Sequence, residues 1–283
     1  MGYIIELKTS QVTAIKIVID AINSLLSDAN FVFYPYYIND SSNNSNLDST
    51  KDKKNIGGIV IKEINKTGKI LVYMRLDADK FDVYKYKYSK EKLTLGIDIN
   101  NLLKCLKCMT HFDTMSWLVD EDDINKLIIV LESNEKREKK TFKLNLMDIE
   151  DDAYEITPIE FPYYITLPSQ DFHKYCKDMS STTDKIEIKA TSNRLYFSGK
   201  GEIGNIEFEI GETNGGLSIV SAVINNTEIV QGLFELKFLL IFAKCTNLSN
   251  YVTLYLKNDY PIIVNYQIAG LGETKLVLSQ SKS

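Results

Sequence analysis

The sequence contains no long apolar run, and this excludes one class of protein at the outset. Its longest uninterrupted apolar stretches, Leu127–Leu131 and Phe238–Ala243, are five and six residues long. A helix that crosses a bilayer needs about 20 apolar residues, so we expect no membrane span and no membrane partner. The segment Met1–Glu6 has neither a basic flank nor an apolar core, and we predict no signal peptide.

Cysteine and histidine are scarce, with four and two copies in 283 residues. Without a signal peptide, we expect the cysteines to be reduced thiols in an intracellular protein. Cys105 and Cys108, with His111 nearby, resemble half of a zinc site, but no second pair of ligands follows. We therefore interpret these cysteines as small buried thiols, and we predict no metal and no cofactor.

Two further patterns suggest chemistry and are better explained by structure. Gly199, Gly201 and Gly204 match the spacing of a dinucleotide-binding loop, but the following Asn205–Ile210 alternates like a strand instead of opening a helix. We predict a turn that connects two strands. The run Asp120–Asp123 offers the carboxylates of a metal-dependent nuclease site, and we interpret it instead as an acidic turn. No established nucleophile, metalloprotease or phosphate-loop motif is present, so we predict no catalytic residues.

Composition changes along the chain indicate two halves. Residues 39–55 are almost free of apolar side chains, which predicts a polar surface insertion. Residues 147–164 are acidic and then punctuated by proline, which predicts a connector. The expected division is a domain at 1–146, the connector at 147–164, and a second domain at 165–283.

Apolar residues recur at helical spacing in four segments: Ser10–Leu26, Asn100–Met109, Ser169–Met179 and Glu235–Cys245. Ser169 is expected to cap the third helix. The second and fourth segments share a Leu-Leu-x-x-(Leu/Ala)-Lys-Cys pattern, which suggests an internal repeat. Most of the remaining chain alternates with the period of a strand.

Each predicted helix carries basic residues on its polar side, although the net charge of the chain is −5. Acidic residues gather elsewhere, which favours contact between the helices and a DNA backbone without base reading. The competing interpretation is that lysine is simply the usual solvated residue on a helix. The candidate DNA-binding residues are Lys16, Lys104, Lys107, His173, Lys174, Lys177, Lys237 and Lys244.

Several longer runs resemble the proliferating cell nuclear antigen family of DNA sliding clamps. They are Leu146–Glu150, Leu167–Ser180, Phe197–Asn205 and Pro261–Gly272, and the resemblance is strongest over Leu95–Leu278. It implies an α+β DNA-clamp fold, in which two similar domains each pack two helices on curved antiparallel sheets. It also implies a homotrimer that closes head to tail into a ring, with the helices lining the hole around duplex DNA.

The resemblance also implies two docking regions. The strand that ends at Leu146 would pair with the strand near 205–210 of the next subunit, through Phe142, Leu144, Leu146, Ile206, Phe208 and Ile210. A pocket under the connector would bind partner peptides through Ile64, Ile70, Val72, Ile156, Pro158, Pro261 and Val277. The family usually has an aromatic residue followed by Ala-Pro-Lys near its C-terminus, whereas this chain has Leu276–Ser281.

The expected function is therefore a non-enzymatic processivity factor that slides on double-stranded DNA and tethers other proteins. Expected partners are a DNA polymerase, a clamp loader, and replication or repair proteins that carry clamp-binding peptides. The expected place of action is a site of DNA replication, in the nucleus or in a viral replication compartment. Two alternatives stay open: a monomeric or dimeric processivity factor without a ring, and an enzyme of DNA metabolism with an unrecognised site.

Overall fold

The computed structural model describes residues 2–36, 57–108, 113–150, 159–221 and 228–281. The expected insertion at 39–55 lies outside these residues, as do His111, Ile156 and Pro158. No helix in the described ranges is long and apolar enough to span a bilayer.

The described residues repeat one order of elements twice: a strand, a helix, five strands, a helix and three strands. The first copy contains β1 (Tyr3–Thr9), α1 (Val12–Asn23), β2 (Asp28–Tyr34), β3 (Gly58–Ile64), β4 (Ile70–Asp77), β5 (Val83–Tyr86), β6 (Leu93–Asp98), α2 (Ile99–Lys107), β7 (Thr114–Asp120), β8 (Lys126–Ser133) and β9 (Glu138–Asn145). The second copy contains β10 (Tyr163–Pro168), α3 (Ser169–Met179), β11 (Lys185–Ala190), β12 (Arg194–Gly201), β13 (Gly204–Gly211), β14 (Ser218–Ser221), β15 (Val230–Glu235), α4 (Leu236–Phe242), β16 (Tyr251–Leu256), β17 (Ile262–Ile268) and β18 (Gly272–Leu278). Short 3₁₀ turns follow β4, at Ala78–Lys80, and α4, at Ala243–Asn247. This repetition confirms the duplication suggested by the shared helix pattern.

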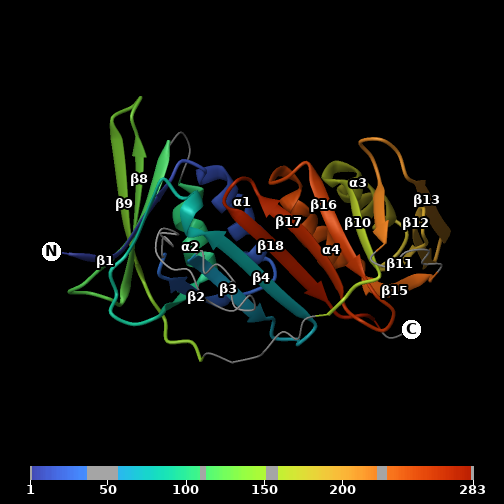
Figure 1. Ribbon diagram of the computed structural model, residues 1–283, viewed down its shortest axis with the longest axis horizontal. Coiled ribbons are helices and arrows are strands. Elements are labelled where there is room, and N and C mark those ends of the chain that lie inside the picture. The colour runs from blue at the N-terminus through green and yellow to red at the C-terminus, as the bar shows by residue number, and fades with distance from the viewer. Residues whose placement is uncertain (1, 37–56, 109–112, 151–158, 222–227, 282–283) are drawn as a thin grey trace, which may run out of the picture.

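The strands form three antiparallel sheets, one of which contains strands of both halves. A nine-stranded sheet has the order β14-β10-β16-β17-β18-β4-β3-β2-β6, and the pairing of β18 with β4 joins the halves near its middle. A five-stranded sheet, β5-β1-β7-β8-β9, closes one end of the molecule, and a four-stranded sheet, β13-β12-β11-β15, closes the other (Figure 1). The α+β clamp fold of two similar domains is therefore confirmed.

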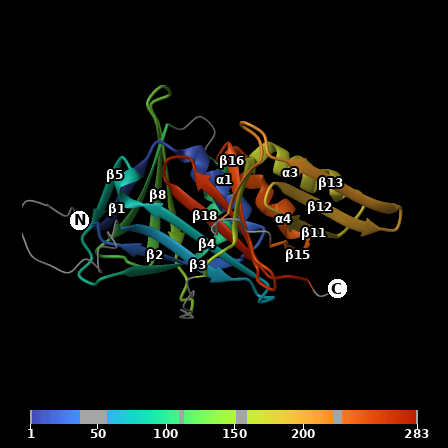
Figure 2. The same ribbon diagram turned by 45° about the vertical axis from the view of Figure 1, so that its right-hand side comes forward.

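The helices form a layer on one side of the nine-stranded sheet (Figure 2). Their buried stripes, such as Ile15 and Ile22 of α1, share one continuous core with alternate residues of the strands. Phe31 of β2 meets Trp117 of β7 edge-on, with ring centroids 6.0 Å apart. Because one side of each helix is buried in this way, its other side faces away from the sheet.

The four predicted helices are confirmed, with corrections at their ends. Ser169 is buried, and its hydroxyl makes no hydrogen bond in the structure, so the prediction that it caps α3 is wrong. A cap that we did not predict opens α2, where the Asp98 carboxylate accepts a hydrogen bond of 2.7 Å from the Asn101 amide. The predicted helix Glu235–Cys245 is divided into α4 and a 3₁₀ turn.

Candidate nucleic-acid interface and docking surfaces

Basic side chains lie on the side of the helices that faces away from the sheet. Six of them are exposed and two, Lys16 and His173, are partly buried. The exposed ones are Lys104, Lys107, Lys174, Lys177, Lys237 and Lys244. Because the buried sides of all four helices pack on one core, the structure brings this predicted set onto one layer of the molecule.

Local contacts orient some of these lysines. The Lys104 ammonium donates to the Asn101 side chain at 3.1 Å, one turn earlier on α2. The Lys244 ammonium donates to the Ser24 hydroxyl at 3.0 Å, which links the second half to the end of α1. This bond joins the basic layer, defined here as these eight helix residues, across the junction of the two halves.

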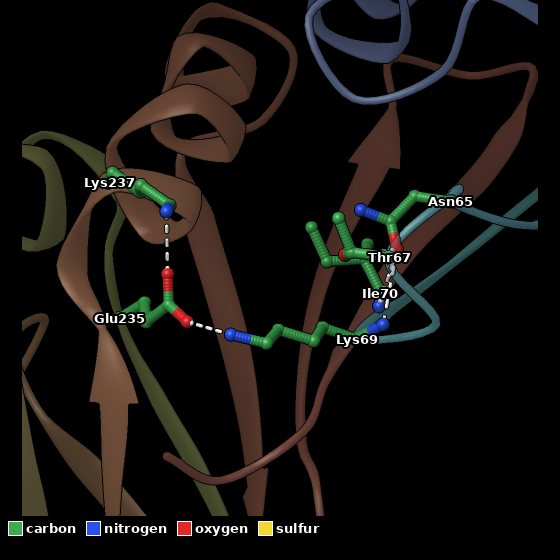
Figure 3. A network of polar contacts seen from close by, with 6 residues as sticks. All are labelled: Asn65, Thr67, Lys69, Ile70, Glu235 and Lys237. Atoms are coloured by element: carbon green, nitrogen blue, oxygen red, sulfur yellow. Dashed lines mark hydrogen bonds and ion pairs between the residues drawn. The ribbon is translucent and has the colours of Figure 1, made fainter.

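Lys237 differs from the others because it belongs to an ion-pair network (Figure 3). Its ammonium lies 2.7 Å from the Glu235 carboxylate, whose other oxygen lies 2.5 Å from the Lys69 ammonium. Hydrogen bonds from Lys237 and then Lys69 lower the pKa of the Glu235 carboxyl. Lys69 stands in the β3–β4 turn, so this network ties the first half to the base of α4 in the second.

The structure corrects two residues of the predicted peptide pocket. Ile70 and Val72 are 1% and 0% exposed, because their side chains point from β4 into the helix-covered core. They therefore do not line an outer surface. The residue between them, Leu71, points the opposite way and is partly buried, as the alternation of a strand requires.

An apolar row crosses the outer face of the nine-stranded sheet at the level of Leu71. Cross-strand pairs connect its members one after another, so their side chains share one face. In order across the sheet, the row consists of Val220, Tyr164, Tyr255, Ile263, Val277, Leu71 and Ile64. Two of the predicted pocket residues, Ile64 and Val277, belong to this row, and Pro261 precedes β17 close to it. The other five residues of the row carry no sequence pattern that predicts them as pocket residues.

Aromatic contacts stiffen one end of this row. The ring of Tyr255 lies 5.4 Å from that of Tyr164 and 5.6 Å from that of Phe161, in edge-on geometry. Ile64 and Val220 at the two ends are 41% and 58% exposed. A row of accessible apolar side chains on a sheet face is a surface suited to apolar anchors of another chain.

The start of the expected connector packs on the same outer face. The Met147 amide donates to the Gly96 carbonyl of β6 at 2.8 Å. The Asn30 side chain, 4% exposed, donates to the Ile149 carbonyl at 3.3 Å. A Cβ atom at position 96 would lie 2.2 Å from the Met147 carbonyl oxygen, so only glycine permits this approach.

Among the six edge strands of the described sheets, two that carry predicted interface residues lie at opposite ends of the molecule (Figure 1). They are β9 and β13. The predicted interface residues Phe142, Leu144, Leu146, Ile206, Phe208 and Ile210 are all partly buried and pack against the core. An open strand edge offers unpaired backbone groups to another strand.

Comparison with known proteins now identifies the family. The model of the proliferating cell nuclear antigen N-terminal domain matches residues 4–155, and that of the C-terminal domain matches residues 155–281. The chain belongs to the proliferating cell nuclear antigen family. A protein of Acanthamoeba polyphaga mimivirus described as "Probable DNA polymerase sliding clamp" is 30% identical over 293 residues. That alignment covers 98% of this chain and 62% of the viral protein, so the chain spans less than two thirds of the length of this relative.

The structure supports the interpretation of the glycine motif at 199–204 and of the acidic run at 120–123 as turns. Gly201 pairs with Gly204 at the turn between β12 and β13, which confirms a strand-connecting turn. The acidic run at 120–123 covers the end of β7 and the turn before β8, and Asp123 pairs with Lys126 at 2.7 Å. Within the described ranges, no three potential metal ligands gather.

The cysteines are free thiols, as expected, but not all are buried. Cys176 and Cys245 are buried, and burial raises the pKa of each thiol to about 12. Cys105 is partly buried and Cys108 is exposed at the end of α2. The prediction that Cys108 is buried is therefore wrong, because the helix ends at Lys107 and leaves the thiol outside the core.

Proposed function

We propose that this chain is the subunit of a DNA sliding clamp. Three copies close head to tail into a ring around double-stranded DNA, and the ring holds a DNA polymerase and other replication or repair proteins on the duplex. The clamp performs no chemistry of its own and is placed on DNA by a loader. Its place of action is a site of DNA replication, in the nucleus or in a viral replication compartment.

The basic layer on the helices is the observation that carries this proposal. The chain has a net charge of −5, yet six exposed lysines stand on the side of the helix layer away from the sheet. Lysine contacts with phosphates are independent of base sequence and weaken with salt, because binding releases counterions. Such a layer suits a protein that must hold the duplex and still move along it.

The duplicated order of strands supports ring closure. Within the chain, the last strand of the second copy, β18, pairs with the third of the five strands of the first copy, β4. The corresponding strands of the opposite copies, β9 and β13, are both edge strands of their sheets in the described part of the chain. Pairing β9 of one subunit with β13 of the next repeats the internal junction, and a heterologous contact of this kind generates a ring when its rotation closes.

The outer row supports the tethering role. Leu71, Ile263 and Val277 provide an apolar strip on the outer face of the nine-stranded sheet. We propose that partner peptides place aliphatic or aromatic anchors on this strip and along the connector. We also propose the domain division 1–146, 147–164 and 165–283, with Ile156 and Pro158 contributing to the connector wall.

A threading experiment tests the ring and the basic layer together. Linear duplex DNA is tethered to beads at one end and incubated with the protein, and the free end is then blocked by a bulky protein. A ring stays on the blocked DNA through a high-salt wash and is released when the DNA is cut, because its retention is topological. A factor that only adheres electrostatically is washed away.

The matched variants separate basic-layer effects from net charge. Replacing Lys104, Lys107, Lys174 and Lys177 by Glu is expected to abolish threading at moderate salt. The same exchange at Lys66, Lys80, Lys87 and Lys136, which are exposed and lie outside α1–α4, is expected to leave threading intact. Equal losses in both variants would refute the basic-layer assignment.

Solution mass provides an independent check. Three copies of the 32.3-kDa chain give about 97 kDa in light scattering at micromolar concentration and moderate salt. A mass of one chain would support the processivity factor without a ring. Turnover of a nuclease substrate would support the enzyme alternative and contradict the clamp.

A further inference from the structure

We propose that the turn between β12 and β13 is a docking element, and that its Ile203 side chain inserts into a groove of the neighbouring subunit formed by the β7–β8 turn and the start of the connector. The occupant of the groove is thus a second copy of this chain. This inference rests on the proposed ring. It adds to the strand pairing a side-chain contact that sets the register of one subunit against the next.

Ile203 is far more exposed than any other large apolar side chain in the described residues. It is 82% exposed, whereas the next, Val220, is 58% exposed. Full exposure of such a side chain loses the stabilisation that burial would provide. A contact with another protein surface would remove this penalty.

The turn that carries Ile203 is held firmly in place. Gly201 lies so close to the loop after α3 that a Cβ atom there would stand 1.7 Å from the Thr182 carbonyl oxygen. The Thr183 hydroxyl of the same loop is 3.0 Å from the Lys200 carbonyl oxygen. The turn therefore presents Ile203 in a defined position, and little conformational entropy is lost when it docks.

A groove of about 780 Å³ lies beyond the end of β9, at the opposite end of the molecule. Ile124 and Met147 project into it and are each 46% exposed. A hydrogen bond of 2.9 Å from the Leu146 amide to the Asn125 carbonyl holds the two walls together. Further apolar lining comes from Tyr88, Leu93 and Leu95.

The pairing of β18 with β4 within the chain is a template for the contact between subunits. Residues of β9 are therefore first matched to residues of β18. Leu127 and Ile262 are the first buried residues of β8 and β17. Their cross-strand partners are Leu144 and Leu278. Leu144 thus corresponds to Leu278, and Phe142, two positions earlier, corresponds to Leu276.

The same comparison relates β13 to β4. Ile61 of β3 pairs with Met74, and Phe197 of β12 pairs with Phe208. On the core-facing side of β3, Ile61 is the second buried side chain, after Ile59. Phe197 follows Leu195 in the same way on β12. Phe208 thus corresponds to Met74, and Ile206 corresponds to Val72.

These correspondences predict the register between subunits. Leu276 stands opposite Val72 within the chain, so Phe142 is expected opposite Ile206 of the next subunit. Counting along antiparallel strands then places Lys143 opposite Asn205. The β12–β13 turn follows directly, so Ile203 arrives beside Asn145 and next to Met147, at the mouth of the groove.

Charge on the outer face of the two strands favours the same arrangement. The exposed outward residues of β9 include Lys139 and Lys143, and those of β13 include Glu207 and Glu209. In the predicted register Lys139 stands opposite Glu209, and Lys143 stands diagonal to Glu207. Opposite charges across a strand pair stabilise it, and two copies of β9 or of β13 would repel each other.

Dissociation of the ring on dilution tests the docking of Ile203. Ile203→Asp is expected to raise the concentration at which the ring dissociates by about tenfold or more in sedimentation velocity, as for an apolar anchor at an interface. The control is Ile229→Asp, which changes an isoleucine that is 53% exposed beside β15, at the other edge of the four-stranded sheet. It is expected to leave the ring unchanged.

Disulfide cross-linking provides a second measurement that does not depend on stability. Met147→Cys and Ile203→Cys are combined in a chain that also carries Cys108→Ser, which removes the exposed native thiol. Mild oxidation should then yield covalent dimers and trimers on a denaturing gel, because each contact takes one thiol from each subunit. Either cysteine alone should leave single chains.

The outcomes separate this inference from the proposed function. If the unmodified protein is monomeric at all concentrations, the proposed ring fails. If the protein is a trimer while Ile203→Asp behaves like Ile229→Asp and the paired cysteines do not cross-link, the ring stands and the docking of Ile203 is refuted.

Discussion

The ammonium group of Lys69 lies 2.5 Å from the carboxylate of Glu235, and this ion pair connects parts of the chain 166 positions apart (Figure 3). Lys69 belongs to the turn between β3 and β4, whose Asn65 side chain accepts hydrogen bonds of 3.1 Å from the Lys69 and Ile70 amides. Glu235 ends β15 and also pairs with Lys237 at the start of α4. One carboxylate thus fastens the two halves at the base of the basic layer.

Replacing Glu235 by Gln should lower the free energy of unfolding slightly and in a pH-dependent way. The lysines are more than half exposed, so we expect a loss of about 0.5–1 kcal/mol at neutral pH. The folded pKa of Glu235 lies below its ordinary value of 4.5. The contribution is therefore present above about pH 4.5 and is lost as the pH falls through the folded pKa.

Urea unfolding of both proteins between pH 3 and pH 8 measures this effect. The gap between them should be constant at neutral pH and should close toward pH 3. A gap that persists at pH 3 would show that the substitution acts through packing and not through the ion pairs.

Alanine substitutions at two adjacent positions should separate folding from partner binding. Ile70→Ala removes a buried side chain and is expected to cost about 2–5 kcal/mol of stability. Leu71→Ala changes the outer row and should cost much less. In a binding assay with a clamp-binding peptide of a polymerase, Leu71→Ala is expected to weaken affinity about tenfold. Unchanged affinity would remove Leu71 from the docking strip.

Lys174 and Lys237 carry the same charge on the helix layer but should respond differently to removal. Lys174→Ala should reduce the salt dependence of DNA association by about one phosphate contact. Lys237→Ala should mainly lower stability, because this ammonium is held by Glu235. Fluorescence anisotropy with a labelled duplex across a salt series, combined with thermal unfolding, distinguishes the two effects. Identical salt slopes for both variants would contradict the distinction.

The thiols should react in an order set by burial. Cys108 is exposed and should react first with a disulfide reagent at pH 8. Cys105 should follow more slowly, since partial burial raises its pKa. Cys176 and Cys245, with pKa values of about 12, should react only on unfolding. Cys108→Ser should remove the fast phase alone, and rapid reaction of more than two thiols in the folded protein would contradict the burial of Cys176 or Cys245.

The sequence predicted the helices and the strand near 141–146 because these depend on clear apolar periods. The stripe of Ile15 and Ile22 repeats at helical spacing, and Phe142 and Leu144 alternate with polar neighbours. The peptide pocket was harder to predict. Ile70, Leu71 and Val72 are all apolar, so the alternation that tells the inner from the outer face is absent there. The burial of Ile70 and Val72 in the folded chain shows that Leu71 is the side chain that points outward.

Contacts between distant segments also had no local pattern. The link from Lys69 to Glu235 joins a turn to a strand end across the two halves, and neither position is distinctive in sequence. The burial of Ser169 depends on how the start of α3 packs, and a serine before a helix predicts a cap instead. Such features follow from tertiary packing, which periodicity does not describe.

Gly96→Ala should loosen the start of the connector while leaving the rest of the fold intact. A methyl group at this position would stand 2.2 Å from the Met147 carbonyl oxygen and close to the Ile149 side chain. The hydrogen bond from the Met147 amide to the Gly96 carbonyl, 2.8 Å long, would then break. Hydrogen exchange should accelerate in peptides that cover 145–150, with an overall loss of about 1–3 kcal/mol. Gly270→Ala is the matched control, because a Cβ atom there meets only the Gln11 side chain, at 3.4 Å or more. If both variants exchange like the unmodified protein at 145–150, the connector does not depend on the close approach at Gly96.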